Sequence, residues 1–270
     1  MAPICYIALM KSIALITGAS SGIGREFARL FAADKIDLVL VARDGAQLEK
    51  VAQELRGTYG VFVKSVAADL SDTRAIDAVY GACRAEELRV QYLVNNAGVG
   101  DFGFFAELDW KRTEVMMNLN MKAVTKLCRL FLPAMIAQKS GRILNVASTA
   151  AFQPGPLIAV YYATKSYVLF LTETMHNELG GTGVTATCLC PGPKQTGFQA
   201  AAQMEESKLF RGKKLPTAHD VAQFGYRAMH DGKMTAIYGF NNALLTFLVR
   251  FLPRALVLTL ARRAQEKIRS

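Results

Sequence analysis

A tyrosine and a lysine four residues apart are the side chains of this sequence best suited to acid–base chemistry. Tyr161 and Lys165 lie in a segment with helical spacing, so the phenol and the ammonium group share a face. A phenol titrates near pH ~10, and a neighbouring cation favours its ionised form. The pair could therefore exchange a proton near neutral pH. Tyr162 is adjacent but lies off that face, so Tyr161 is the candidate acid–base group.

A glycine-rich turn near the start of the chain predicts a dinucleotide-binding site. An apolar run at residues 12–17 precedes the turn, and apolar residues with helical spacing follow it. In such a strand–turn–helix unit, glycines let a pyrophosphate approach backbone N–H groups at the start of the helix. The candidate residues of the turn are Thr17, Gly18, Ser20, Ser21, Gly22, Ile23 and Gly24.

The same turn also spells Gly-x-Ser-x-Gly around Ser20, a pattern found at the nucleophile of serine hydrolases. Hydrolase chemistry needs an acid and a histidine as partners of the serine. The three histidines, His176, His219 and His230, have no setting that marks one of them as this partner. A hydrolase that uses Ser20 is therefore the less favoured alternative.

The end of the second predicted strand indicates which dinucleotide would bind. Enzymes that use NAD usually place Asp or Glu there, against the adenosine ribose. Here Ala42 is followed by Arg43, whose guanidinium can bind a 2′-phosphate. We therefore expect NADP(H) as the cofactor. Asp69 and Leu70 follow the third predicted strand, where Asp69 could contact adenine or cap the next helix.

The elements that must position these groups alternate between strands and helices. This alternation implies right-handed crossovers and a parallel sheet covered on both faces. We therefore expect an α/β fold, a Rossmann-type doubly wound parallel sheet, with a C-terminal amphipathic helical extension. Strands are predicted at residues 12–17, 37–42, 61–67, 92–94, 142–147, 184–189 and 236–238, and long helices at 112–138 and 156–179.

The chain is interpreted as one domain over residues 1–240, followed by a basic, apolar helical tail at 241–270. Residues 1–10 are expected to form an N-terminal extension, without the basic leader of a signal peptide. Residues 193–215 follow the sixth strand and are the expected substrate loop. The five cysteines show no metal-like spacing, which favours free thiols in a reducing compartment and no metal site.

The net charge of +10 is concentrated in the tail, where residues 250–269 hold six basic side chains and one acidic side chain. This distribution argues against a general nucleic-acid surface. Apolar residues in the tail follow helical spacing, and Pro253 interrupts them, so a membrane span is not expected. Two interpretations remain: a subunit interface or a cover over the substrate mouth, and an interfacial helix at residues 244–269 on anionic lipid.

Five motifs taken together resemble the classical short-chain dehydrogenase/reductases. They are the glycine turn, residues 95–98, Ser148, the Tyr161–Lys165 pair and Pro191–Gly192, and they keep the family's order and spacing over about residues 11–240. Residues 42–44, 102–104 and 151–156 are similar to a bacterial-type subgroup often labelled DltE-like, a label that implies no defined substrate.

The resemblance implies a role for each matched residue in hydride transfer between NADP(H) and a carbonyl or alcohol. Tyr161 would be the acid/base, Lys165 would lower its pKa and bind the nicotinamide ribose, and Ser148 would bind the substrate oxygen. Asn120 would hold a water molecule that links Lys165 to solvent, with Asn118 as its rival for that position. The remaining cofactor contacts would come from Asn95, Asn96, Ala97, Gly98, Pro191, Gly192 and Thr196.

A hydrophobic ketone, aldehyde or secondary alcohol is the expected substrate, because aromatic side chains follow several strands. They are Phe102, Phe104, Phe105, Phe152, Phe198 and Phe210. The resemblance also implies a homodimer or homotetramer in the cytoplasm. The main alternative function is a non-catalytic nucleotide-binding or scaffold protein, against which the intact Ser148, Tyr161 and Lys165 argue.

Overall fold

The computed structural model of the chain describes residues 12–193 and 215–265. Within these residues, seven strands form a parallel sheet in the order β3-β2-β1-β4-β5-β6-β7. The order reverses between β1 and β4, which leaves a crevice at the carboxyl ends of these two strands. The strands are β1 Ile13–Thr17, β2 Asp37–Ala42, β3 Val63–Ala67, β4 Val90–Asn95, β5 Gly141–Val146, β6 Val184–Cys190 and β7 Thr235–Ile237.

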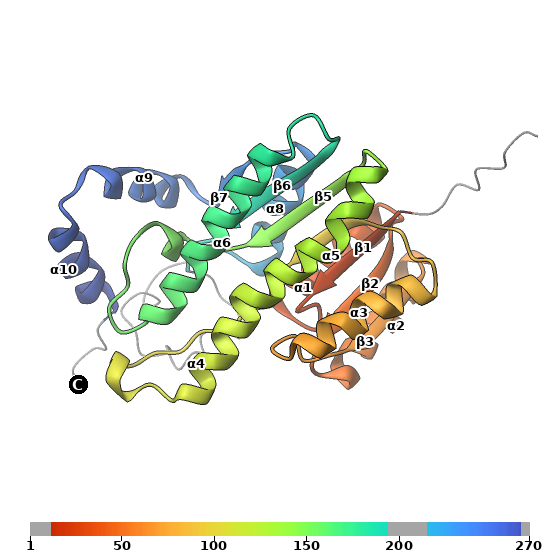
Figure 1. Cartoon of the computed structure of the whole chain (residues 1–270), viewed down its shortest axis with the longest axis horizontal. Helices are drawn as coiled ribbons and strands as arrows, with labels where there is room; N and C mark the ends of the chain where they lie inside the picture. Colours follow the sequence, from red (N-terminus) through yellow and green to blue (C-terminus); the bar gives the residue numbers. More distant parts are fainter. Residues whose placement is uncertain (1–11, 194–214, 266–270) are drawn as a thin grey trace, which may run out of the picture.

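Helices cover both faces of the sheet, as the alternating pattern predicts (Figure 1). One apolar core packs α1 (Gly22–Ala33), α2 (Gly45–Tyr59) and α8 (Ala218–His230) against the sheet. The other packs α3 (Thr73–Ala85), α5 (Val124–Ala137) and α6 (Ala159–Glu178) against the opposite face. The predicted doubly wound α/β fold is therefore confirmed.

One helix begins later than its predicted start, for a local reason. Helix α6 was expected from residue 156 but begins at Ala159, because Leu157 has a φ of 69° and Ile158 is not helical. Helix α3 is capped by Asp72, whose side chain accepts a hydrogen bond from the backbone N–H of Arg74.

The long helix predicted at residues 112–138 is interrupted by a π-helical segment. Helix α4 (Trp110–Met117) leads into this segment, Asn118–Ala123, which continues as α5. Such single wide turns often occur at functional sites. Asn120 lies within the wide turn and is 1% exposed.

The tail forms α9 (Phe240–Leu248), a short 3-10 turn (Val249–Phe251) and α10 (Arg254–Gln265), so Pro253 separates two helices as expected (Figure 1). Among the residues that the structure describes, no helix is long and apolar enough to cross a bilayer. Cys83, Cys128, Cys188 and Cys190 are buried free thiols. The N-terminal extension, Thr196, Phe198, Phe210 and nearly all of the predicted substrate loop lie outside the described residues.

Candidate active site

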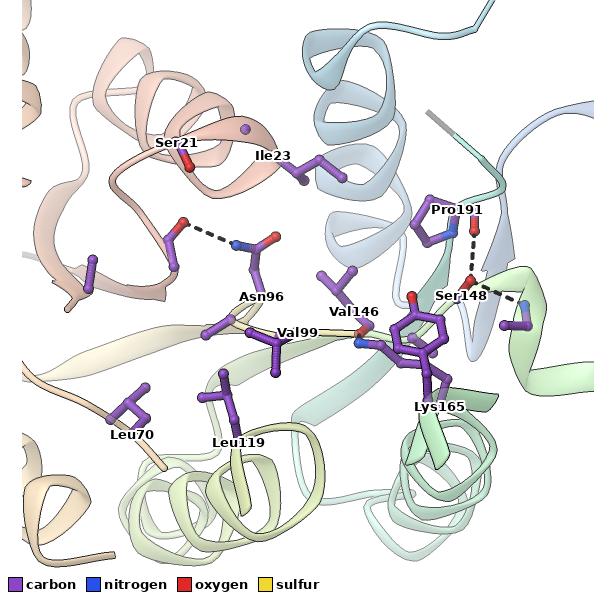
Figure 2. A pocket seen from close by; sticks show the side chains of 18 of the residues that line it. Ser21, Ile23, Leu70, Asn96, Val99, Leu119, Val146, Ser148, Lys165 and Pro191 are labelled. Carbon is purple, nitrogen blue, oxygen red and sulfur yellow. Dashed lines mark hydrogen bonds between the residues drawn. The ribbon is translucent and has the colours of Figure 1, made fainter. Parts of the chain in front are cut away.

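A cavity of about 790 Å³ lies beside the reversal of strand order and brings most of the predicted site residues together. Figure 2 shows Ser21 and Ile23 on one side of the cavity, and Ser148, Lys165 and Pro191 on the other. The predicted residues that line it are Gly18, Ser20, Ser21, Gly22, Ile23, Arg43, Asp69, Leu70, Asn96, Ala97, Gly98, Ser148, Tyr161, Lys165, Pro191 and Gly192. Thr17, Gly24 and Asn120 lie behind this lining.

The glycine turn is built for close approach of a ligand to the backbone. Gly18 and Gly22 have φ angles of 66° and 56°, which favour glycine. A Cβ on Gly24 would come within 2.2 Å of the Gly18 carbonyl oxygen, so any side chain there would open the turn. With the N-terminus of α1 beside it, this cradle fits the pyrophosphate of a dinucleotide.

Thr17 and Asn96 hold the glycine turn against the end of β4. The Thr17 hydroxyl accepts hydrogen bonds from the backbone N–H groups of Asn96 and Ala97, both at 3.0 Å. In return, the Asn96 side chain donates to the carbonyl oxygens of Thr17 at 2.9 Å and Gly18 at 3.3 Å. These bonds join two segments nearly eighty residues apart in sequence. Thr17 and Asn96 therefore shape the cradle.

Lys165 is a buried cation at the centre of the cavity wall. Its Nζ donates to the Val146 carbonyl oxygen at 2.8 Å and lies 5.8 Å from the centre of the Tyr161 ring. Burial lowers the pKa of Lys165 to about 8. Gly98 leaves room for the ammonium group, because a Cβ there would lie 3.3 Å from Nζ.

Tyr161 is a protonated phenol in this setting, which differs from the expected lowering of its pKa. Burial raises the pKa of Tyr161 well above its usual range, and a hydrogen bond with Ser148 offsets this only in part. The ammonium group of Lys165 is turned toward Val146, which explains why the phenol gains little from it. A neutral phenol beside Ser148 is a group that can donate a proton.

Ser148 is fixed at the end of β5 by contacts on both sides. Its hydroxyl donates to the Pro191 carbonyl oxygen at 3.4 Å and accepts from the backbone N–H of Ala150 at 3.1 Å (Figure 2). It thereby caps the short 3-10 helix Thr149–Phe152. The hydroxyls of Ser148 and Tyr161 thus converge at one point of the cavity, where a substrate oxygen could accept from both.

Asn120, rather than its rival Asn118, carries the contacts that link the π-helical segment to the site. Its side chain donates to the Val99 carbonyl oxygen at 2.9 Å and to the Thr164 hydroxyl at 3.0 Å, and accepts from the Val99 N–H at 3.0 Å. Gly98 is needed here as well, since its Cβ would lie 3.2 Å from the Asn120 oxygen. That Asn120 holds a water molecule stays a prediction.

Sequence reasoning gave no role at the site to three residues of this region. Thr164 precedes Lys165 and is buried against Asn120. Tyr162, which lines the cavity, accepts a hydrogen bond from Gln265 of α10 at 2.7 Å. The only sequence signal for Gln265 is its place in a spacing of four with Val257 and Ala261, the residues that α10 buries.

Arg43 and Asp69 line the cavity near the expected adenosine position. Arg43 is exposed. The Asp69 carboxylate accepts hydrogen bonds from the backbone N–H and hydroxyl of Ser71, at 3.0 and 2.8 Å. Asp69 thus organises the turn before α3, and its contact with adenine stays a prediction.

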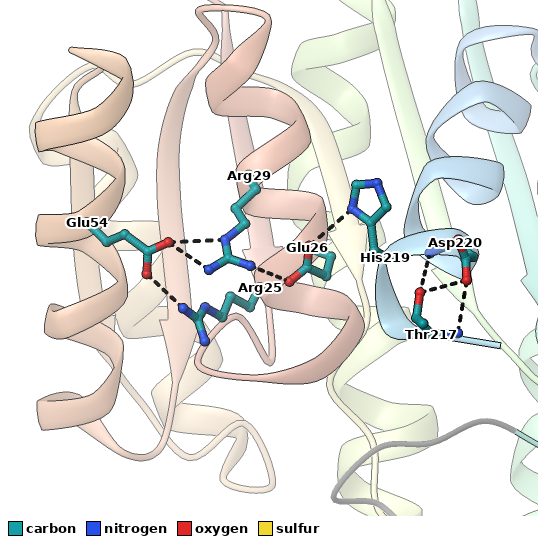
Figure 3. Close-up of polar contacts among 7 residues, drawn as sticks. All are labelled: Arg25, Glu26, Arg29, Glu54, Thr217, His219 and Asp220. Atoms are coloured by element: carbon teal, nitrogen blue, oxygen red, sulfur yellow. Dashed lines mark hydrogen bonds and ion pairs between the residues drawn. The ribbon is translucent and has the colours of Figure 1, made fainter. Parts of the chain in front are cut away.

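The histidines are engaged elsewhere, which weighs against a hydrolase at Ser20. His176 Nδ1 lies 2.9 Å from the Ala186 carbonyl oxygen, and the His230 ring packs on Tyr226. His219 contacts Glu26 in a polar cluster that joins α1, α2 and α8 (Figure 3). Across the described part of the chain, no histidine lines the cavity and no group of metal-binding side chains gathers.

Comparison with known proteins gives the same assignment for most of the chain. The family model described as short chain dehydrogenase matches residues 12–207. A very-long-chain 3-oxoacyl-CoA reductase from Anas platyrhynchos is 29% identical over 265 residues, covering 95% of this chain and 81% of that protein.

Two solved structures have the same fold as this chain over nearly its whole length. A short-chain dehydrogenase from Sphingobium yanoikuyae in complex with NADPH gives a TM-score of 0.81 at 30% identity, covering 96% of this chain and 99% of the other. A short chain dehydrogenase/reductase from Burkholderia phymatum in complex with NAD gives 0.80 at 29% identity, covering 96% and 98%. The chain therefore belongs to the short-chain dehydrogenase family.

Proposed function

We propose that this oxidoreductase is NADP(H)-dependent and interconverts a hydrophobic ketone or aldehyde with the corresponding alcohol. The observation that carries the proposal is the convergence of Ser148, Tyr161 and Lys165 in the cavity that also contains the glycine turn. A nicotinamide cofactor bound there would supply or accept the hydride. The protein's part is to orient the reactants, exclude water and move one proton.

The proton moves at the Tyr161 hydroxyl. Because burial keeps this phenol protonated, it can donate to the carbonyl oxygen during reduction and take the proton back during oxidation. The Ser148 hydroxyl can turn its proton from the Pro191 carbonyl oxygen to the same substrate oxygen and hold it in place. The Lys165 cation lies 5.8 Å from the centre of the Tyr161 ring, and turning its ammonium group from Val146 toward the hydroxyl would favour the phenolate left after transfer. Its ammonium group can also bind the hydroxyls of the nicotinamide ribose.

The test is NADPH oxidation against a panel of carbonyl compounds, with wild type beside Tyr161→Phe. Loss of the hydroxyl should lower kcat at least ~100-fold, as expected for removal of a general acid. Tyr167→Phe is the matched control, because Tyr167 is exposed on the same helix. Full activity of Tyr161→Phe would reject the mechanism. NADPH binding without turnover by wild type would favour the non-catalytic alternative.

An apolar substrate is supported by the side of the cavity near Ser148. Ala150, Ile158 and Tyr162 form a small apolar cluster there, against which Phe102 and Tyr161 pack. The name of the Anas platyrhynchos relative, a very-long-chain 3-oxoacyl-CoA reductase, points to an apolar chain in its own substrate. Turnover limited to small charged oxo-acids would contradict this part of the proposal.

We further propose that residues 244–269 contact the surface of an anionic membrane on the cytoplasmic side. Large apolar side chains of α9 and the turn after it face outward: Leu245, Phe247 and Phe251 are 60%, 55% and 70% exposed. The sequence has no Asp or Glu between residues 232 and 265, whereas exposed Arg250 and Arg254 lie beside these apolar groups. Apolar side chains bordered by cations suit a bilayer interface with anionic headgroups.

Co-sedimentation with vesicles tests this contact. The double variant Phe247→Ser/Phe251→Ser should bind anionic phosphatidylserine vesicles at least ~10-fold more weakly than wild type, because apolar burial drives insertion. Phe62→Ser is the control, since Phe62 is exposed on the opposite part of the domain before β3. Equal binding by both variants, or equal binding to neutral vesicles, would overturn the proposal.

A further inference from the structure

The C-terminal helices contact two residues that line the cavity and one that lies outside its lining. Asn242 of α9 lies against Gly192, where an added Cβ would come within 2.5 Å of the Asn242 side chain. The guanidinium carbon of Arg262 lies 5.8 Å from the centre of the Phe104 ring. Nε2 of Gln265 donates a hydrogen bond to the hydroxyl of Tyr162 at 2.7 Å. Two separate helices of the tail therefore meet the same end of the site.

The bond between Gln265 and Tyr162 is buried at both ends. Gln265 is 1% exposed and Tyr162 is 7% exposed. A buried amide costs free energy unless it is hydrogen-bonded, so this contact fixes the end of α10 at one place. The residues that α10 buries, Val257, Ala261 and Gln265, form one stripe that ends at this bond. The bond is thus part of the buried face of α10 and not a contact between exposed surface groups.

Tyr162 transmits the position of α10 to the cavity. Its ring packs on Gly155, where a Cβ would come within 2.4 Å of the ring. Burial raises the pKa of Tyr162 to about 12, so it stays a neutral phenol. Tyr162 lines the cavity, follows Tyr161 in the chain and shares an apolar cluster with Ile158. A shift of its ring would change the shape of the substrate side.

We propose that α10 supports the substrate side of the cavity from behind Tyr162 and that Gln265 is a positioning residue that sets substrate selectivity through Tyr162. This inference rests on the proposed reduction of hydrophobic carbonyl compounds. A Tyr162 ring that is held in place offers apolar contact to a bulky substrate, whereas a small ketone reaches Ser148 and Tyr161 without that contact. Gln265 acts through Tyr162 and takes no part in proton or hydride transfer.

The first experiment compares Gln265→Leu with wild type on a small aliphatic ketone and a bulky aryl ketone. The kcat/KM for the bulky ketone should fall about tenfold through KM, equivalent to about 1.4 kcal/mol. The small ketone should change less than about twofold, and the dissociation constant of NADPH should not change. Arg263→Gln, exposed on the same turn, is the control and should match wild type. Equal losses for both ketones would overturn the proposal.

The second experiment tests whether the two side chains act together. Tyr162→Phe and Gln265→Leu each break the same hydrogen bond and leave the other side chain without this one contact, whereas the double variant removes both groups. The double variant should therefore retain more kcat/KM for the bulky ketone than the product of the two single losses predicts. Strictly multiplicative losses would contradict the coupling.

A third readout does not depend on activity. Amide hydrogen exchange in α10 should be faster in Gln265→Leu than in wild type, because the end of the helix loses its anchor. If wild type reduces no ketone, the proposed function fails while this exchange still tests the anchor. Unchanged exchange in α10 would overturn the inference by itself.

Discussion

The candidate catalytic residues form a site in which a buried cation and a buried phenol are kept close together. Burial lowers the pKa of Lys165 and raises that of Tyr161, so both groups are held in protein surroundings that disfavour charge. The structure retains this arrangement although it costs free energy, which is typical of groups kept for chemistry. Gly98 allows it, because its missing side chain leaves space for the lysine head and for Asn120.

Lys165→Met should make the protein more stable and inactive at neutral pH. The pKa of Lys165 is about 8 in the fold against 10.5 in the unfolded chain. Below pH 8, the charged Lys165 therefore lowers the free energy of unfolding by on the order of 3 kcal/mol. The unfolded state binds more protons between pH 8 and 10.5, so the cost disappears as the pH rises through this window. Urea unfolding should show a higher free energy of unfolding for Lys165→Met than for wild type at pH 7, and no such difference at pH 10.5. A gain of equal size at both pH values would show that packing, not charge, is responsible.

Arg43→Asp should change cofactor preference without preventing binding. A carboxylate at this position repels a 2′-phosphate and can accept a hydrogen bond from a ribose hydroxyl. The dissociation constant of NADPH should rise about 10- to 100-fold, as expected for 1.4 to 2.8 kcal/mol, while that of NADH should not rise. Fluorescence titration measures both, and Lys50→Asp on the exposed side of α2 is the control. Equal weakening of both cofactors would place Arg43 outside the phosphate site.

Among the elements, a chain of buried polar groups fixes α6 to the sheet. The Asn95 side chain donates to the Asn145 side-chain oxygen at 2.8 Å, and the Asn145 nitrogen donates to the Thr172 hydroxyl at 2.9 Å. All three residues are at most 2% exposed. Because α6 also contains Tyr161 and Lys165, these bonds set the position of this candidate pair above β5.

Thr172→Val should loosen this connection. Valine nearly preserves the shape of threonine but leaves the Asn145 N–H without its acceptor, which costs about 1–3 kcal/mol. The free energy of unfolding in urea should fall by that amount. Thr125→Val, which changes a partly buried hydroxyl on α5, should cost less. No loss of stability in Thr172→Val would mean that the bond does not hold α6.

The element pattern was predictable from sequence, while several site contacts were not. The strands and the two layers of helices were predictable because each element must bury an apolar face, and this leaves apolar runs or helical spacing in the sequence. The glycine turn, Ser148 and the Tyr161–Lys165 pair were likewise recognisable by type and spacing. The π-helical segment was not, because one wide turn leaves apolar spacing almost unchanged. Gln265 meets Tyr162 across 103 positions, and that contact depends on how α10 packs.

For the whole molecule, an exposed apolar stripe on α6 supports assembly with a second copy of the chain. Phe170 and Tyr167 are 65% and 41% exposed on the outer face of α6, and Trp110 of α4 is 66% exposed. Helices α4 and α6 are in contact, which brings a third exposed aromatic residue into the same part of the molecule. Self-association through a two-fold axis would bury the stripe against its own copy. A homodimer, or a homotetramer built from two such dimers, is the assembly we propose.

Phe170→Glu should reduce this assembly to monomers. A carboxylate placed against its own copy would be desolvated and would meet a like charge, so the dimer dissociation constant should rise at least ~100-fold, or about 2.8 kcal/mol. Light scattering after size exclusion at micromolar concentration measures the mass. Phe62→Glu, which places the same charge beside β3, should leave the mass unchanged. A wild-type monomer at this concentration would contradict the proposed assembly. A Phe170→Glu variant with the wild-type dimer mass would instead place the interface on another face of the molecule.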